Sequence, residues 1–117
     1  FDAATVAFGI RNFNDLNQAF KEVFRVLKTD GEFMILESST PKNPILRWLN
    51  YMYLKCWVQF VGGIISKQKG AYTYLMNSIH EFYTSDELQL MLIDAGFKNV
   101  QINTFMLGSV QLIHAKK

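Results

Sequence analysis

The sequence has few of the residues that cross-link a chain or anchor it in a membrane. Cys56 is the one cysteine in 117 residues, so no disulfide can form within the chain, and this usage fits a reducing compartment. Cys and His nowhere show the spacing of a zinc site. In the aromatic region the longest uncharged run, residues 56–66, is far shorter than the roughly 20 apolar residues that cross a bilayer. We therefore expect no disulfide framework, no metal and no membrane span in this chain.

Several motifs of catalysis and of nucleotide binding are also missing. The sequence contains no GxSxG elbow, no Walker loop and no GxGxxG, so a cofactor site cannot be read from motifs alone. Its net charge is only +2 and its Lys and Arg are dispersed, which argues against a nucleic-acid partner. Half of the residues are hydrophobic, which is typical of a globular domain or of part of one.

What is present begins with a strand–helix–strand pattern. Residues 3–8 are mostly apolar on both faces, as in a central parallel strand. Residues 15–28 carry one apolar stripe at helical spacing, with Asn14 as the expected N-cap. Residues 32–38 read as a second buried strand. The sequence therefore predicts a βαβ unit with parallel strands and a right-handed crossover.

The middle of the chain is strongly aromatic. Residues 44–61 are apolar around nearly the whole circumference of a predicted helix, which Gly62 and Gly63 are expected to end. Such a helix is either wrapped by protein or in contact with an apolar partner, and the sequence leaves both open. Cys56 lies within it and is interpreted as an inert small apolar residue. A further helix is predicted over residues 71–81.

The last third returns to regular elements. TSDE gives a capping box, with Thr84 as the N-cap and Glu87 three positions on, and Gly96 marks the helix end. Residues 99–106 and 109–115 read as two strands of an antiparallel hairpin. The order of elements predicts an α/β fold, the second half of a doubly wound sheet that ends in this hairpin.

Two strand ends offer polar side chains. Ligands of open α/β sheets bind beyond the carboxyl ends of the strands, where Arg11 and Glu37 fall. Arg11 could hold an anionic ring oxygen, and Gly9 allows a close backbone approach. The alternatives are a surface ion pair of Arg11 with Asp15 and a purely structural carboxylate at position 37. Tyr72 could line a pocket, although its apolar neighbours favour a place in the core.

A resemblance to a known family rests on four stretches: FDAATVAFGIRN, RVLKTDGEFMILESS, YTYLMNSI and DAGF. Together they resemble the C-terminal half of the ubiquinone/menaquinone biosynthesis C-methyltransferases, which are class I enzymes that use S-adenosylmethionine. The resemblance covers essentially all of the chain, in the right order and spacing. Residues 25–39 come close to a family signature and are more specific than the fold.

The resemblance implies a fold and a division of the chain. Residues 1–117 would be the C-terminal part of one Rossmann-like methyltransferase domain, whose N-terminal S-adenosylmethionine-binding half would precede Phe1. Residues 41–83 would be a helical insertion that covers the substrate. On its own, this chain is then expected to be inactive.

The implied reaction is methyl transfer from S-adenosylmethionine to a ring carbon of a polyprenylated quinol, in menaquinone or ubiquinone biosynthesis. Arg11 matches the arginine of the family's G[LI]RN motif and is the implied catalytic residue. Substrate binding would involve Arg11, Asn12, Glu37 and Tyr72, and cofactor binding Ala7, Phe8 and Gly9. The expected location is cytoplasmic, compatible with peripheral contact at a membrane surface and with a homodimer.

Two departures from the family and two alternatives remain. Thr29 and Asp30 stand where the family usually has Pro-Gly, and Ala7 stands where Ser is common, which would remove a hydroxyl contact with the cofactor. One alternative is a class I methyltransferase for another small lipid. The other is a non-catalytic lipid-binding or interaction module derived from a methyltransferase, since the chain lacks a cofactor loop.

Overall fold

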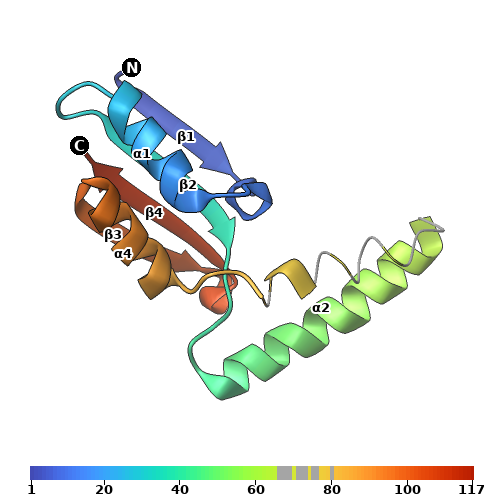
Figure 1. Cartoon of the computed structure of the whole chain (residues 1–117). Coiled ribbons are helices and arrows are strands. Elements are labelled where there is room, and N and C mark those ends of the chain that lie inside the picture. Colours follow the sequence, from blue (N-terminus) through green and yellow to red (C-terminus); the bar gives the residue numbers. More distant parts are fainter. Residues whose placement is uncertain (66–69, 71–73, 75–76, 80) are drawn as a thin grey trace.

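A computed structural model describes residues 1–65, 70, 74, 77–79 and 81–117. Four strands form one mixed sheet in the order β1-β2-β4-β3. Its strands are β1 (Ala3–Ala7), β2 (Glu32–Ser38), β3 (Lys98–Phe105) and β4 (Val110–Lys116). Figure 1 shows the helices α1 (Leu16–Val26) and α4 (Ser85–Ala95) on the same face of this sheet.

The predicted βαβ unit is confirmed. β1 and β2 pair in parallel, and α1 connects them with an amphipathic helix that buries Leu16 and Phe20. The predicted N-cap, Asn14, is wrong by one residue. Asp15 takes this place, because its carboxylate accepts the backbone N–H of Gln18 at 2.9 Å. A carboxylate here satisfies one of the first-turn N–H groups and lies favourably toward the positive end of the helix dipole.

The core lies between the sheet and the two helices. Phe33 and Ile35 of β2 and Ile113 of β4 point toward the helices, and Leu88 and Leu92 of α4 meet them. Phe97 contacts two aromatic rings, with its ring centroid 5.2 Å from that of Phe24 and 5.6 Å from that of Phe33. These edge-to-face and tilted contacts fix α1 against the end of α4.

Helix α4 begins and ends as its sequence predicts. Thr84 Oγ1 accepts the backbone N–H of Glu87, and the Glu87 carboxylate accepts the N–H of Thr84, so the capping box is complete. Gly96 ends the helix with a φ of +110°, and a β-carbon there would lie 2.8 Å from the Phe24 ring. Glycine is therefore required at this position both by the backbone conformation and by the close ring.

The C-terminal hairpin is confirmed, and its second strand enters the middle of the sheet. β3 and β4 are joined by the 3-10 turn η2 (Met106–Gly108) and pair in antiparallel fashion. β4 also pairs antiparallel with β2, so it lies between β2 and β3. Gln111 consequently has Glu37 on one side and Thr104 on the other as register partners.

The first strand differs from its expected burial. Residues 3–8 are predicted as a buried central strand, but β1 pairs only with β2 and lies at an edge, with its residues exposed or half-buried. The sheet face that points away from α1 and α4 carries half-buried apolar residues, among them Leu36 and Leu112. A strand that is apolar on both faces yet exposed at an edge is one whose neighbours are not supplied by the described chain.

The aromatic segment forms the long helix α2 (Pro44–Ile65), which extends away from the sheet in Figure 1. The prediction that Gly62 and Gly63 end it is wrong, since helical backbone continues to Ile65. A glycine inside a helix costs only about 1 kcal/mol relative to alanine, which weakens a helix without dictating its end. Cys56 is exposed on this helix. The helix predicted over residues 71–81 lies largely outside the described residues.

We expect Gly96→Ala to lower the free energy of unfolding of the full-length protein by about 2 kcal/mol or more. A β-carbon at positive φ costs about 1–2 kcal/mol, and the overlap with the Phe24 ring adds to this. Urea denaturation followed by circular dichroism measures the change. Gly70→Ala is the matched control, because a β-carbon at Gly70 meets no atom within 4 Å. Equal stability of the two variants would contradict the role given to Gly96.

Candidate active site

The chain turns sharply where β1 ends. Ala7 is the last residue of the strand, and Phe8 adopts a φ of +51°, a conformation that costs a non-glycine residue about 1–3 kcal/mol. The Phe8 backbone N–H still donates to the Leu36 oxygen at 2.8 Å, so the turn stays tied to β2. Strain of this kind persists only where the surrounding structure holds it, and it commonly marks a ligand-facing turn.

The 3-10 turn η1 (Ile10–Asn12) follows and is anchored by one apolar side chain. Ile10 is completely buried, while the Asn12 and Phe13 N–H groups donate to the Gly9 and Ile10 oxygens at 3.1 Å. Asn12 itself is exposed. Gly9 has an unstrained φ of −122°, and a β-carbon there would meet nothing closer than 3.4 Å, so nothing in the described chain requires glycine.

The turn brings Arg11 beside Glu37 of β2. Arg11 Nη1 lies 3.9 Å from Glu37 Oε1, and the two side chains are 15% and 1% exposed. Glu37 Oε1 accepts the N–H of Ser38, but Arg11 Nη1 and Glu37 Oε2 have no hydrogen-bond partner within the described part of the chain. The alternative ion pair with Asp15 is not formed, because the Asp15 carboxylate caps α1 instead. The pair thus retains one donor and one acceptor for a further polar group.

Gln111 extends this polar group along the sheet. It is fully buried beside Glu37, its Oε1 accepts the Ser85 hydroxyl at 2.7 Å, and its Nε2 has no partner among the described residues. A row of polar side chains therefore crosses the strand ends from η1 to the first turn of α4. We call it the polar row, and its members are Arg11, Glu37, Gln111 and Ser85.

Sequence reasoning missed Gln111 and Ser85. Gln111 is a single polar residue on the inward face of β4, in line with Ile113 and Ala115. That alternation was visible, but its significance depends on β4 lying next to β2, which local sequence does not reveal. Ser85 reads as a first-turn helix residue, and its link to the site likewise depends on the sheet order.

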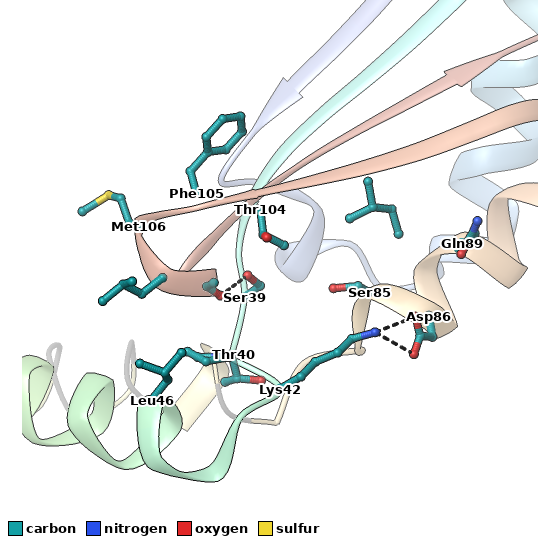
Figure 2. Close-up of a pocket in the computed structure, with 14 residues that line it drawn as sticks. Ser39, Thr40, Lys42, Leu46, Ser85, Asp86, Gln89, Thr104, Phe105 and Met106 are labelled. Carbon is teal, nitrogen blue, oxygen red and sulfur yellow. Dashed lines mark hydrogen bonds and ion pairs between the residues drawn. The ribbon is translucent and has the colours of Figure 1, made fainter.

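A cavity of about 700 Å³ lies next to the polar row. Figure 2 shows its walls: the loop after β2, the start of α2 at Leu46, the start of α4, and the end of β3 with the turn η2. The Lys42 ammonium reaches across to Asp86 at 3.2 Å. Ser85 both lines this cavity and hydrogen-bonds Gln111. Arg11 and Glu37 do not line it, so the cavity adjoins the predicted chemical residues without containing them.

The remaining predicted site residues fall in different places. Ala7 and Phe8 are exposed at the carboxyl end of β1, and Gly9 is half-buried. Tyr72 lies outside the described residues. No group of three or more His, Cys, Asp and Glu in the described part of the chain could hold a metal ion. Among the described helices, none combines the length and the apolar character needed to cross a membrane.

A family model and individual related sequences point to the same family. The model of the ubiE/COQ5 methyltransferase family matches residues 1–117. A ubiquinone/menaquinone biosynthesis C-methyltransferase of Geotalea daltonii is 39% identical over the whole chain, which covers 49% of that protein. A demethylmenaquinone methyltransferase of Bacteroides fragilis is 38% identical over the whole chain, which covers 48% of that protein. The chain thus spans about half the length of these curated relatives.

Comparison with solved structures supports the fold. A SAM-dependent methyltransferase of Thermotoga maritima aligns with a TM-score of 0.61 and 20% identity, over 100% of this chain and 56% of that one. At this identity the likeness speaks for the fold alone. It confirms the predicted Rossmann-like α/β architecture of class I methyltransferases.

We expect a double-mutant cycle to show strong coupling between Arg11 and Glu37. Glu37→Leu leaves a largely buried guanidinium without its counter-charge and should cost about 3 kcal/mol or more of stability. Arg11→Met/Glu37→Leu should cost less than the sum of the single variants by about 1 kcal/mol or more. Urea titration of the full-length protein measures all three. Additive losses would mean that the two side chains do not interact.

Proposed function

We propose, because the chain belongs to the ubiE/COQ5 methyltransferase family, that it forms the C-terminal part of an S-adenosylmethionine-dependent methyltransferase of quinone biosynthesis. The proposed reaction is C-methylation of a polyprenylated quinol ring, either a demethylmenaquinol or a ubiquinone precursor. The observation that carries the proposal is the Arg11–Glu37 pair, which keeps unused hydrogen-bonding capacity at the strand ends where ligands of this fold bind.

The architecture supports a larger catalytic domain around this chain. β1 has a free edge and one face of the sheet is only half-buried, which suits further strands and helices supplied by an N-terminal half. Because the chain covers about half of its curated relatives, that half would contribute the Gly-rich loop and the acidic residue expected for the cofactor. The 117-residue chain alone would then be inactive.

The residues at the end of β1 fit part of S-adenosylmethionine. Ala7, Phe8 and Gly9 lie at the carboxyl end of the strand, and the Phe8 side chain is exposed there. An exposed aromatic ring suits a sulfonium cation, since ring faces attract positive charge. When bound, the cofactor supplies an electrophilic methyl group on that sulfonium.

Arg11 would act on the acceptor ring. A ring hydroxyl would lose its proton to leave a phenolate. Methyl transfer in line to the adjacent ring carbon would break the carbon–sulfur bond of the cofactor and leave S-adenosylhomocysteine, and loss of the proton that this ring carbon carried would restore the aromatic ring. The Arg11 guanidinium is permanently charged, so it would stabilise the phenolate through its unpaired Nη1 or orient a water that takes the proton. Glu37 would hold the guanidinium in place, and the exposed Asn12 would hold the ring hydroxyls.

The helical segment 41–83 would cover the substrate and its prenyl tail, with Tyr72 in the substrate site. We place the enzyme in the cytoplasm, in peripheral contact with the membrane in which such a quinol dissolves; a homodimer contact through the same segment is a further option. The competing function is a lipid-binding or interaction module without catalysis, which the exposed apolar surface of α2 favours. A second competitor is a methyltransferase for another small lipid.

We expect calorimetric titration to detect S-adenosylmethionine binding to the full-length protein and none to residues 1–117 alone. The physical reason is that, in the proposed enzyme, this chain would contribute only the end of β1 to the cofactor site. The sequence contains no Gly-rich loop of the GxGxxG type, and the acidic residue that would bind the cofactor's ribose is expected in the other half. If a folded full-length protein binds no cofactor, the methyltransferase proposal fails and the lipid-binding module takes its place. Binding by the isolated chain would overturn the assignment of the cofactor site to the other half.

We expect Arg11→Ala to lower kcat by about a hundredfold or more in the full-length enzyme, while affinity for S-adenosylmethionine changes little. Arg11→Lys keeps the charge but loses the planar guanidinium group, so its kcat should lie between those of the wild type and Arg11→Ala. Turnover of a short-chain demethylmenaquinol, followed by chromatography, measures the effect. Arg25→Ala is the control, since Arg25 is an exposed arginine paired with Glu22 on α1. A kcat within threefold of wild type for Arg11→Ala would remove Arg11 from the mechanism.

A further inference from the structure

Helix α2 is apolar and yet exposed along its length. Leu46, Asn50 and Leu54 form a half-buried stripe toward the body of the protein, and no side chain described in this helix is fully buried. Large apolar side chains are exposed along the helix: Ile45, Trp48, Leu49, Tyr53, Trp57, Phe60 and Ile64. A patch of this size on a folded protein marks a contact with another molecule or with a membrane.

Two hydrogen bonds among the described residues hold the first turns of the helix. The Arg47 guanidinium donates from Nε to the Pro41 oxygen at 3.2 Å, and the Ser109 hydroxyl donates to Asn50 Oδ1 at 3.0 Å. Beyond these first turns α2 leaves the sheet (Figure 1), and Trp57 and Phe60 are 58% and 72% exposed. The most apolar turns are thus held out from the fold.

Charge is distributed unevenly between this segment and the rest of the chain. Residues 38–80 contain five of the 12 Lys and Arg and none of the 10 Asp and Glu. The rest of the chain, with seven cations and ten anions, is net acidic although the whole chain is net basic. On α2 the cations are Arg47 and Lys55, both exposed and interleaved with aromatic side chains.

We propose that α2 docks on an anionic lipid surface, lying along the interface with its aromatic side chains among the headgroups and with Arg47 and Lys55 on lipid phosphates. Trp and Tyr prefer the interface, and cations near it are attracted to anionic lipid. No described helix can cross a membrane, which leaves a position along the surface. The inference deepens the peripheral membrane contact of the proposed function, on which it rests, by naming the surface and the lipid chemistry that make this contact.

Charge favours a lipid surface over a second copy of the chain. Two α2 helices packed through the faces that carry Arg47 and Lys55 would bring these cations of both copies into one interface. Residues 38–80 have no acidic side chain to pair with them. Like charges across an interface disfavour it. Lys42 is already paired with Asp86, so the docking charge falls to Arg47 and Lys55 among the described cations of the segment.

Flotation of the full-length protein with lipid vesicles tests this proposal. We expect binding to vesicles that contain phosphatidylglycerol, weaker binding to pure phosphatidylcholine, and loss of the difference in molar salt. Arg47→Gln/Lys55→Gln should weaken binding to the anionic vesicles by about fivefold for each cation removed. The matched control is Lys21→Gln/Lys98→Gln, which removes two exposed cations outside the segment and should bind as wild type.

A second variant separates the apolar contribution from the charge. Trp57→Ala/Phe60→Ala should weaken binding to both kinds of vesicle, and unchanged thermal unfolding of all variants shows that folding is intact. Absence of vesicle binding together with a dimer in sedimentation would overturn the proposal in favour of a second copy. Equal loss in the two cation pairs would overturn the role of Arg47 and Lys55. Cofactor titration is read separately, so failure of the methyltransferase proposal leaves these outcomes unaffected.

Discussion

Parallel pairing of β1 with β2 is the interaction on which the candidate site depends. Because the strands run the same way, Ala7 lies opposite Leu36, and the residues that follow each strand arrive at one edge of the sheet. This brings Arg11 to Glu37 although they are 26 positions apart in the chain. The buried Ile10 then fixes the turn, so that neither partner is free to seek solvent. An antiparallel pair would have put these two side chains at opposite ends of the sheet.

The polar row works against stability, which bears on its purpose. A buried polar atom without a partner costs about 1–3 kcal/mol, and Arg11, Glu37 and Gln111 each contribute one within the described chain. An apolar row at the same positions would fold more stably. Retention of such groups at a strand edge, beside a strained Phe8, is the pattern of a site that stabilises something other than the fold.

Local rules predicted the elements well, and two of the failures share one cause. The capping box at Thr84 and the helix end at Gly96 follow from short-range chemistry, and the placement of Arg11 and Glu37 near the carboxyl ends of β1 and β2 follows from strand direction. The edge position of β1 and the role of Gln111 depend on which strands are neighbours, and that is set by contacts between distant parts of the chain. The helix through Gly62 and Gly63 is a failure of another kind, since glycine lowers helix stability by about 1 kcal/mol without dictating where a helix ends.

The departure at Asp30 shows how a turn can keep its shape without its usual residue. Asp30 has a φ of +64°, the conformation that suits the Gly of the related sequences, and its carboxylate lies 3.3 Å from the Lys116 ammonium. Aspartate tolerates this region better than most residues do. Asp30 can therefore form the turn between α1 and β2 without a glycine. Its replacement of the usual glycine is a change in the chemistry of the turn.

The two ends of the helical segment connect the surface of α2 to the site. The chain leaves the sheet after Ser38, the residue that follows Glu37. It returns to the sheet region at the start of α4, where Ser85 hydrogen-bonds Gln111. Both ends of the segment are therefore attached to the polar row. A lipid surface that binds α2 would lie near the edge of the sheet that holds Arg11. The apolar tail of the proposed substrate could then remain in the lipid while its ring reaches that edge. On this reasoning the aromatic, basic helix α2 and the buried polar row are parts of one arrangement, in which, under the proposed function, the substrate would not need to leave the membrane completely to be methylated.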